Sequence, residues 1–298
     1  VILNEDESIY YQPLFENIME IVYSKRGNVV DVPGGIFVRT KNTLTEEDEF
    51  LLYKWAKLVV KAENGIVIKS KEEEEIPNKK FNEKSEDYPI NTKNLELDYF
   101  NGYGGFSNGG KEYVIRLTKD LNTPLPWINV IANKEFGFIV DELGTGFSWC
   151  QNSRENKLTP WYNDPLVGKS GEIIYIMDEY TGEVFTITPY PIRDENDYII
   201  THGQGYTCFS HESHGIEQKL TMFTPMEDNI KINLISLKNQ TARDRNISLV
   251  YYIRPVLGVT DEETENLLET GIKEETMFIN NSTNSEFKDS TIFMGTSE

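Results

Sequence analysis

Cysteine, histidine and positive charge are all scarce in this sequence of 298 residues. The only two cysteines, Cys150 and Cys208, are too few for a disulfide framework, which favours reduced thiols in a cytoplasmic protein. Lysine and arginine total 29 against 49 aspartates and glutamates, giving a net charge of −20. This sign of charge repels phosphate backbones and anionic lipids. Nucleic acid is therefore not expected as a partner, whereas neutral ligands such as sugars are compatible with the charge.

Long apolar runs are also missing. No run reaches the ~18–20 apolar residues that a membrane-spanning helix needs. The first residues, VILNEDESIY, lack the basic stretch and the apolar core of a signal peptide. They also lack an initiator methionine, so we expect the sequence to be a piece of a longer polypeptide.

Residues 1–68 are predicted to form a helical lead-in. The segment TLTEEDEFLLYKWAKLVV, residues 43–60, carries the clearest helical pattern in the sequence. Thr45 is a good residue to cap its first turn, with Asp48 three positions later as in a capping box. Apolar residues that include Trp55 recur at helical spacing, so we expect this indole to lie in a core.

Residues 69–96 are highly charged and poor in aliphatic side chains, which predicts a linker. Over residues 97–298 the apolar period changes to two, and short runs are rich in β-branched and aromatic residues. Turn residues inside 172–188 predict a β-hairpin there. The runs KINLISLKN (231–239) and NISLVYYIR (246–254) are predicted to pair with each other across the turn QTARDR.

The alternation of apolar and polar residues predicts which side chains of these strands face a core. In the first of the two runs it places Ile232 and Leu234 on the apolar face. Many short strands with frequent turns and no helices between them predict an antiparallel sandwich or barrel. The final run, TIFMG at 291–295, has no obvious successor. We expect either that the chain ends inside a larger sheet system or that this strand lies at an edge.

The sequence offers no clear catalytic or metal site. His202, His211 and His214 could share a metal, but the flanking residues are typical of two strands joined by a turn, which favours hydrogen-bonded histidines. The glycine-rich segment FNGYGGFSNGG precedes a strand instead of a helix, which argues against a dinucleotide site. No serine or cysteine stands in a recognisable nucleophile motif. We therefore predict no catalytic residue, no metal and no cofactor.

The stretch SWCQNSRENKLTPWYNDP, residues 148–165, is unusual because two tryptophans bracket a run of amides. Indole rings stack on the apolar C–H face of a sugar, and amide, guanidinium and carboxylate groups bond to its hydroxyls. The candidate sugar-binding residues are Trp149, Asn152, Arg154, Asn156, Trp161, Asn163 and Asp164. The alternative is a structural loop whose tryptophans plug a sandwich and whose amides bond to the backbone. Composition alone leaves both interpretations open.

Several long segments, in the same order, resemble the N-terminal β-domain of glycoside hydrolase family 94, formerly glycosyltransferase family 36. They are YFNGYGGFSNGGKEYVI, PWINVIANKEFGFIVDELGTGFSWCQNSRENKLTPWYNDP, GEIIYIMDEYTGEVFTITPYPIR and HGQGYTCFSHESHGI. The likeness is strongest to the phosphorylase-like region of cyclic β-1,2-glucan synthases. The helical segment GGIFVRTKNTLTEEDEFLLYKWAKLVV also resembles the part of those enzymes just before that region.

This resemblance implies a mainly β fold, an antiparallel supersandwich of the galactose-mutarotase-like kind, incomplete at its C-terminus and preceded by a short helical segment. It implies that catalysis lies in a following (α/α)₆ barrel that this sequence lacks, so Asp164 is not the general acid. In the family, the region that matches 149–165 lies near the sugar-binding cleft. Arg154, Asn156 and Asn163 are thus the best candidates for its rim, and contacts in a homodimer are a further expectation.

We therefore expect a non-catalytic, carbohydrate-associated part of a β-glucan synthase or phosphorylase. Its expected partners are a β-glucan or oligosaccharide and the missing C-terminal catalytic barrel of the parent chain. The expected location is the cytoplasm, with the parent enzyme anchored to the inner membrane as one possibility. Two other functions stay open, a stand-alone glucan-binding module and a purely structural or dimerisation domain.

Overall fold

The computed structural model describes residues 1–4, 13–26, 30–56, 59, 95–162 and 170–297. The chain divides into two compact units, Val1–Lys79 and Lys80–Glu298. We call the second one the β-unit and describe each unit by itself. Asn163 and Asp164 of the predicted sugar-binding set lie outside the described residues.

The first unit combines two short strands with two helices. Its elements are β1 (Ile2–Asn4), α1 (Pro13–Arg26), β2 (Val38–Thr40), the 3-10 turn η2 (Lys41–Thr43) and α2 (Glu46–Trp55). The strands β1 and β2 pair in parallel. The prediction of a helical lead-in omitted them, because a three-residue strand is too short to show a period of two.

The start of α2 confirms the predicted capping box, whereas the prediction for its end is wrong. Thr45 Oγ1 accepts a hydrogen bond from the Asp48 backbone N–H (3.1 Å), and Asp48 Oδ2 accepts one from the Thr45 N–H (3.0 Å). The helix ends at Trp55, with Ala56 as its C-cap, instead of continuing to residue 60. Trp55 is 76% exposed, so it does not lie in a core of the described residues.

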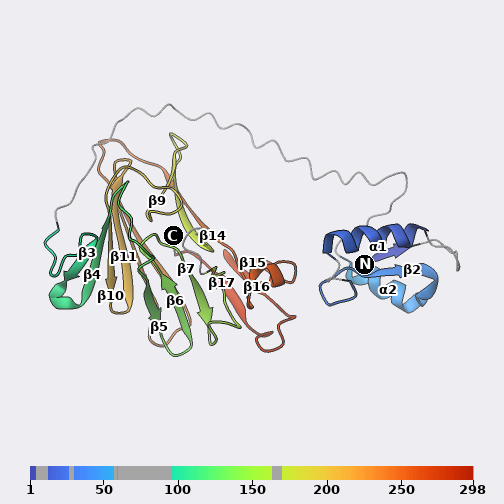
Figure 1. Ribbon diagram of the computed structural model, residues 1–298. Helices are drawn as coiled ribbons and strands as arrows, with labels where there is room; N and C mark the ends of the chain where they lie inside the picture. Colours follow the sequence, from blue (N-terminus) through green and yellow to red (C-terminus); the bar gives the residue numbers. More distant parts are fainter. Residues whose placement is uncertain (5–12, 27–29, 57–58, 60–94, 163–169, 298) are drawn as a thin grey trace. The chain divides into compact units, whose positions relative to one another are not determined.

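The described part of the β-unit is built mainly from short strands, labelled β3 to β17 (Figure 1). They are β3 (Gly104–Ser107), β4 (Glu112–Leu117), β5 (Asn129–Ala132), β6 (Phe136–Val140), β7 (Gly146–Cys150), β8 (Glu172–Asp178), β9 (Val184–Thr186), β10 (Tyr198–Gly203), β11 (Tyr206–Ser213), β12 (Ile216–Phe223), β13 (Ile232–Asn239), β14 (Ile247–Ile253), β15 (Glu269–Lys273), β16 (Thr276–Asn280) and β17 (Thr291–Met294). The 3-10 turn η3 (Asn108–Gly110) and the short helix α3 (Asp261–Thr264) lie between strands.

These strands form one large antiparallel sheet and three smaller ones. The six-stranded sheet has the order β13-β12-β11-β10-β4-β3. The three-stranded sheets have the orders β14-β8-β9, β5-β6-β7 and β15-β16-β17. Every pairing within them is antiparallel, which confirms the predicted mainly β, antiparallel class.

The main hydrophobic core lies between the six-stranded sheet on one side and the sheets β5-β6-β7 and β14-β8-β9 on the other (Figure 1). Its buried side chains alternate along the strands, as with Ile115 and Leu117 on β4 or Phe138 and Val140 on β6. Burying each side chain of this size contributes about 1.5–3 kcal/mol. The period of two therefore identified the core strands correctly.

A second, smaller core lies at the sheet β15-β16-β17. It consists of Leu257, Ile279 and Ile292. Leu158 packs against this core and against the main one, so it joins the two. The strand β17 lies at an edge of its sheet, which is one of the two outcomes expected from the sequence.

The predicted hairpin over 172–188 is confirmed, but the predicted pairing of β13 with β14 is wrong. β8 pairs with β9, whereas β13 pairs with β12 and β14 pairs with β8. The two strands of the QTARDR connection thus belong to different sheets. Leu234 is also exposed, and Ile235 and Leu237 face the core instead. A slip of one residue reverses every side chain of a strand, so the pattern had the right period and the wrong phase.

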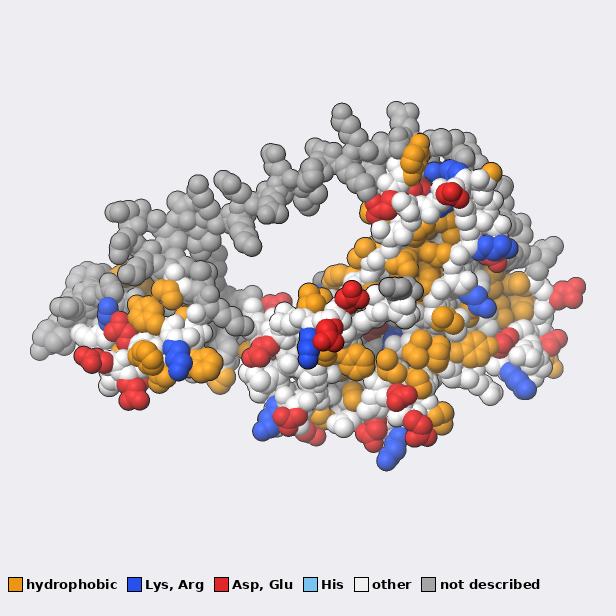
Figure 2. Space-filling view, turned by 180° about the vertical axis from the view of Figure 1, so that it is seen from behind, with side chains coloured by type: hydrophobic (Ala, Val, Ile, Leu, Met, Phe, Trp, Pro, Cys, Tyr) orange, Lys and Arg blue, Asp and Glu red, His pale blue; other side chains and the backbone are white. Residues whose placement is uncertain are grey.

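Large apolar side chains are also exposed on the β-unit. Leu234 on β13, and Leu249 and Val250 on β14, are all about half exposed or more. Figure 2 shows hydrophobic side chains gathered across a hollowed face of this unit. Leu249 and Val250 are neighbours in one strand, so β14 presents apolar groups on both of its faces. Such exposure is typical of a surface that contacts another part of a protein.

Candidate functional site

The predicted aromatic stretch forms a tight loop that continues β7. We define the aromatic loop as residues 147–162. Gln151 turns the chain with a φ of +63°. The side-chain Oδ1 of Asn152 then accepts hydrogen bonds from the backbone N–H groups of Arg154 and Glu155, both at 2.9 Å. The turn is therefore fixed by its own side chains, and the Asn152 Nδ2 group makes no hydrogen bond within the described residues.

Asn156 supports this loop from inside. Its side chain is fully buried, and its Nδ2 donates to the Cys150 carbonyl (3.0 Å). Its own carbonyl accepts from the Cys150 N–H (3.2 Å), and further along the Leu158 N–H donates to the Ser148 carbonyl (2.8 Å). The loop thus folds back on β7, and Asn156 lies beneath its surface instead of on a rim.

The two tryptophans pack against one phenylalanine. The ring centroids of Trp149 and Trp161 are each 5.2 Å from that of Phe147, with tilts of 38° and 34°. Both indoles are partly exposed. Gly137 on β6 lies under Trp149, where an added Cβ would come within 2.4 Å of the indole. Contact with Phe147 and, for Trp149, with Gly137 thus holds the indole rings in place. Part of each ring remains exposed to solvent.

Arg154 is the most exposed group of the predicted set that the structure describes. Its side chain is 81% exposed, and its Nε lies 3.5 Å from Glu155 Oε1. An ion pair on the surface contributes at most about 1 kcal/mol, so it leaves the guanidinium available to a ligand. Arg154, Trp149, Trp161 and Asn152 therefore occur together at the surface of one ordered loop.

Glu172 forms the support beneath the loop. Its Oε1 accepts hydrogen bonds from Ser148 Oγ (2.6 Å) and Thr159 Oγ1 (2.9 Å), which lie on the two arms of the loop. Its Oε2 accepts from Lys231 Nζ and the Tyr251 hydroxyl, at 2.7 and 2.8 Å. One carboxylate therefore joins the aromatic loop to both layers of the sandwich.

The charges of this support are largely hidden from water. The side chains of Glu172 and Lys231 are only 10% and 13% exposed. Burial opposes ionisation of Glu172, but Lys231 and the hydroxyl donors outweigh it and lower the carboxyl pKa to about 2. The Lys231 ammonium also lies 4.6 Å from the centre of the Phe138 ring. Glu172 therefore keeps its negative charge across the ordinary pH range.

The end of the loop is fixed to the segment around α3. The Tyr162 hydroxyl donates to Asp261 Oδ2 (2.6 Å), and the same oxygen lies 2.6 Å from Arg254 Nη2. Burial and the nearby Asp261 carboxylate raise the pKa of Tyr162 to about 12. Lys157 Nζ also donates to the Val259 carbonyl (2.9 Å). Both ends of the aromatic loop are therefore anchored.

The arrangement offers groups that can contact a sugar. Stacking surfaces and an exposed guanidinium are present at the surface. The loop hydroxyls that donate to the Glu172 carboxylate, Ser148 and Thr159, are buried. The described residues contain no group of three or more histidine, cysteine, aspartate or glutamate side chains that could hold a metal ion. Cys150 is partly buried, and burial raises the pKa of its thiol, which makes it a poor nucleophile.

Comparison with known protein families identifies the fold. Residues 111–298 match the family described as "Glycosyl hydrolase 94, supersandwich domain". The chain belongs to glycosyl hydrolase family 94. The match includes the described part of the aromatic loop and its supporting residues Glu172, Lys231, Tyr251 and Asp261, and it confirms the family expected from the sequence motifs.

Several characterised proteins are similar to this family 94 domain. The cyclic β-(1,2)-glucan synthase NdvB of Rhizobium meliloti is 37% identical over 166 residues, which are 55% of this chain and 6% of that protein. The N,N'-diacetylchitobiose phosphorylase of Vibrio proteolyticus is 27% identical over 154 residues, 51% of this chain and 19% of that protein. The solabiose phosphorylase of Paenibacillus borealis is 29% identical over 160 residues, 51% of this chain and 20% of that protein. The alignments therefore span at most a fifth of these relatives.

None of the helices in the described ranges of this family 94 chain combines the length and the apolar character that a membrane span requires.

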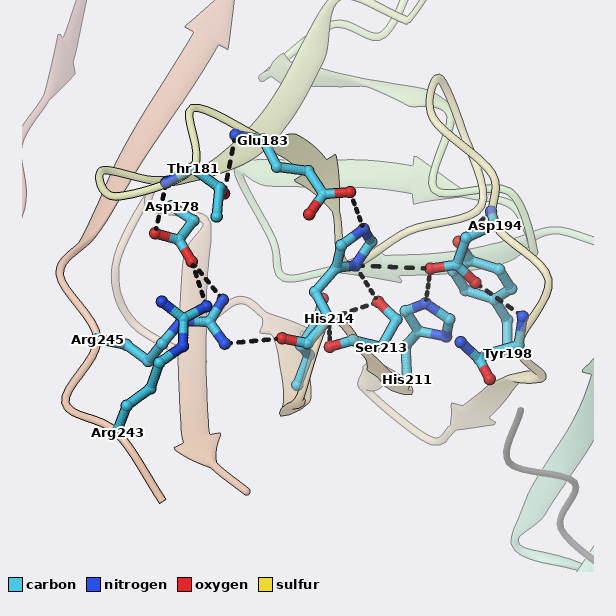
Figure 3. A network of polar contacts seen from close by, with 12 residues as sticks. Asp178, Thr181, Glu183, Asp194, Tyr198, His211, Ser213, His214, Arg243 and Arg245 are labelled. Carbon is cyan, nitrogen blue, oxygen red and sulfur yellow. Dashed lines mark hydrogen bonds and ion pairs between the residues drawn. The ribbon is translucent and has the colours of Figure 1, made fainter. Parts of the chain in front are cut away.

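The three histidines of the family 94 domain are interior hydrogen-bonding groups, as the sequence favoured. His211 lies between the Asp194 carboxylate (2.7 Å from Nε2) and the Asp197 carbonyl (3.1 Å from Nδ1). His214 lies on the other side of Asp194, with its Nδ1 at 4.0 Å (Figure 3). The rings of His211 and Tyr198 stack at 3.7 Å. The network joins the turn between β11 and β12 to the segment before β10.

The same region explains why β13 and β14 separate. The Asp178 carboxylate, at the end of β8, forms ion pairs with Arg245 (2.6 Å) and Arg243 (3.6 Å), and both arginines come from the connection between β13 and β14 (Figure 3). Arg245 Nη1 also donates to the His214 carbonyl (2.9 Å). The connection is thus held at a corner of the sandwich, where the chain passes from one layer to the other.

The residues that support the loop could not be recognised from the sequence. Glu172 opens a strand and Lys231 precedes one, positions where charged residues are usually solvated. Their partners lie 13 to 79 positions away in the chain. The one hint of an anchoring contact was Tyr162, which directly follows Trp161. A tyrosine hydroxyl that becomes buried usually needs a hydrogen-bond partner.

Proposed function

We propose that this chain is the non-catalytic β-domain of a β-glucan synthase or phosphorylase, and that its aromatic loop contributes to a carbohydrate-binding cleft. The observation that carries the proposal is a loop, anchored at both ends, that carries the partly exposed Trp149 and Trp161 and the exposed Arg154. Family membership supports it, and so do relatives named for a β-glucan, chitobiose and solabiose.

The loop would act by positioning sugar units. An indole face stacks on the C–H face of a pyranose ring, and a guanidinium bonds to neighbouring hydroxyls. In a phosphorolytic reaction a phosphate oxygen attacks the anomeric carbon while an acid protonates the departing oxygen. We assign those steps to an (α/α)₆ barrel outside this chain. The apolar groups that β14 exposes on both faces support contacts with a further domain.

The proposal keeps Trp149, Asn152, Arg154 and Trp161 as sugar contacts, together with the predicted contacts Asn163 and Asp164. It gives Asn156 the role of a buried support, because its amide is bonded to the Cys150 carbonyl. A cytoplasmic location, an anchor of the parent enzyme in the inner membrane and a homodimer are further parts of the proposal.

The test uses the complete enzyme that carries this domain, with a β-(1,2)-linked gluco-oligosaccharide as substrate. Trp161→Ala and Arg154→Ala should each lower kcat/KM by about tenfold, mainly through KM, because each removes one binding contact. Trp55→Ala, which removes an exposed indole in the other unit, is the matched control. Kinetics like those of the parent enzyme in both loop variants would refute the proposed role.

A further inference from the structure

A second group of aromatic side chains lies at the other edge of the six-stranded sheet from β13. Phe106 on β3, Tyr113 on β4 and His202 on β10 are direct partners in neighbouring strands. Direct partners lie on the same face of a sheet. The row continues through Thr207 and Met222, which are buried in the sandwich. The rings of Phe106, Tyr113 and His202 therefore continue the inner face of the sheet from its buried part towards its exposed edge at β3.

Trp127 covers part of this open end and leaves a hollow. Its ring meets those of Tyr103 and Tyr113 edge to face, with centroids 5.8 Å apart in both cases and interplanar angles of 77° and 71°. The open hollow has a volume of about 300 Å³. We call it the aromatic hollow, lined by Asn101, Tyr113, Trp127, Ile128 and His202. Its volume is at the lower end of the range for small-ligand sites, which is about 300–1,000 Å³.

The backbone at Trp127 is held on both sides. Its N–H donates to Glu142 Oε2 (2.7 Å), and its carbonyl accepts from His202 Nε2 (3.1 Å). His202 Nδ1 in turn accepts from the Thr207 hydroxyl (3.0 Å), which fixes the tautomer. Burial lowers the pKa of His202 to about 4, so the ring is uncharged at neutral pH. The wall of the hollow is thus preformed before any ligand binds.

The polar groups of the hollow are few and neutral. Asn101 Oδ1 accepts from the backbone N–H groups of Tyr103 and Gly104, both at 3.1 Å, so its side chain is fixed. Asn101 Nδ2 donates to the Tyr113 hydroxyl (3.0 Å). That hydroxyl therefore still has its own hydrogen to donate. The five lining residues include no charged side chain at neutral pH, so the hollow offers nothing to neutralise an anion.

We propose that the aromatic hollow is a second carbohydrate site, which binds one pyranose ring of a neutral glucan chain. The perpendicular rings of Trp127 and Tyr113 offer an aromatic face to the C–H groups of a sugar, and the Tyr113 hydroxyl and Asn101 amide face its hydroxyls. A purely apolar partner would cover the remaining hydrogens of the Tyr113 hydroxyl and the Asn101 amide without pairing them, which costs about 1–3 kcal/mol for each group that becomes buried. The choice of a glucan rests on the proposed function, but the hollow shares no residue with the aromatic loop.

The test is a titration of the 298-residue chain with a β-(1,2)-linked glucopentaose, followed by saturation-transfer NMR. The chain should bind in the millimolar range or tighter. Trp127→Ala should weaken binding by about tenfold and Tyr113→Phe by a smaller factor, since the phenylalanine keeps the ring and loses the hydroxyl. Trp55→Ala in the first unit is the control and should leave the affinity within about twofold. Trp161→Ala is measured beside these variants.

A second measurement does not depend on the folding of Trp127→Ala. The chain has four tryptophans, so the variant Trp55→Phe, Trp149→Phe, Trp161→Phe keeps Trp127 as the only indole. The glucopentaose should protect its fluorescence from acrylamide. No binding by the parent chain, or unprotected Trp127 fluorescence, overturns the aromatic hollow and leaves the loop to its own test in the complete enzyme. A loss of affinity confined to Trp161→Ala also overturns it, while supporting the loop.

Discussion

The aromatic loop and the aromatic hollow use the same kinds of side chain on two different supports. In the loop, the indoles lie above an ionised carboxylate, Glu172, with hydrogen bonds from four side chains. In the hollow, Trp127 is held through its backbone by Glu142 and by the uncharged His202. The loop therefore depends on a buried charge pair, whereas the hollow depends on a ring that must stay neutral. The two sites should respond differently to mutation and to pH.

The largest expected effect is at the support of the loop. Glu172→Gln leaves the Lys231 ammonium buried without its counter-charge, so it should lower the free energy of unfolding by about 3–5 kcal/mol. Urea denaturation measures this loss. Glu217→Gln is the matched control, because Glu217 forms an exposed pair with Lys238 (3.7 Å) and should change stability by less than about 1 kcal/mol. Equal effects of the two substitutions would show that Glu172 is no internal support.

The next largest effect is a loss of stability at acid pH that is caused by His202 in the aromatic hollow. The pKa of His202 is about 4 in the folded chain and 6.5 in the unfolded one. Between these values the unfolded chain binds more protons, so the stability contribution is complete above pH 6.5 and is lost as the pH falls towards 4. The full difference corresponds to about 3 kcal/mol. Asp141, whose pKa burial raises to about 6, acts in the opposite direction between pH 3.8 and 6.

A substitution of His202 separates its effect on stability from the opposing effect of Asp141. His202→Gln should remove the acid sensitivity, so the unfolding free energies of the parent and the variant should converge by about 2–3 kcal/mol between pH 7 and pH 4.5. Urea denaturation at both values checks this. The Glu172 carboxyl, with a folded pKa of about 2 against an ordinary 4.5, contributes stability above pH 4.5 that is lost only as the pH falls towards 2. A difference between parent and variant that does not change with pH would contradict the assignment of His202.

A smaller effect is expected where the loop meets α3. Tyr162→Phe removes the hydrogen bond to Asp261 but leaves that carboxylate paired with Arg254, so it should cost about 1.5–2 kcal/mol. Tyr99→Phe, at a tyrosine that is 89% exposed, is the matched control and should have almost no effect. Thermal unfolding of the two variants side by side gives the comparison. A loss as small as that of the control would mean that the loop is not anchored at this end.

The smallest effect on stability is expected at Arg154, which is proposed to contact sugar and not to support the fold. Arg154→Ala should change the free energy of unfolding by no more than about 0.5 kcal/mol, because its side chain is exposed and its ion pair with Glu155 lies at the surface. The same substitution is expected to impair sugar binding in the complete enzyme. A clear destabilisation in urea would instead indicate that Arg154 supports the loop.

Features that depend on near neighbours in the sequence could be predicted. The capping box of Thr45 and Asp48 spans three residues, and the hairpin over 172–188 is closed by its own turn. The partner of β14 could not be predicted in this way. Its alternation identified a strand, but β14 pairs with β8, which is far away in the chain, while β13 pairs with the preceding strand β12.

The candidate site shows the same limit. The sequence identified Trp149, Trp161 and Arg154 from their chemistry, and the described structure brings these groups together on one loop. It gave no indication that Asn156 is buried, because an amide has the same composition whether it faces a ligand or the backbone. Nor did it reveal Glu172, whose four partners come from separate elements. Recognition of the family motifs supplied the fold that local patterns left undecided.

Leu158 connects the aromatic loop to both hydrophobic cores. Its side chain packs against both hydrophobic cores, and its carbonyl accepts a hydrogen bond from the Val256 N–H (2.9 Å). The neighbouring Lys157 N–H donates to the Gly258 carbonyl (3.1 Å). A ligand that moved the loop would therefore have to act against these contacts with the second core as well.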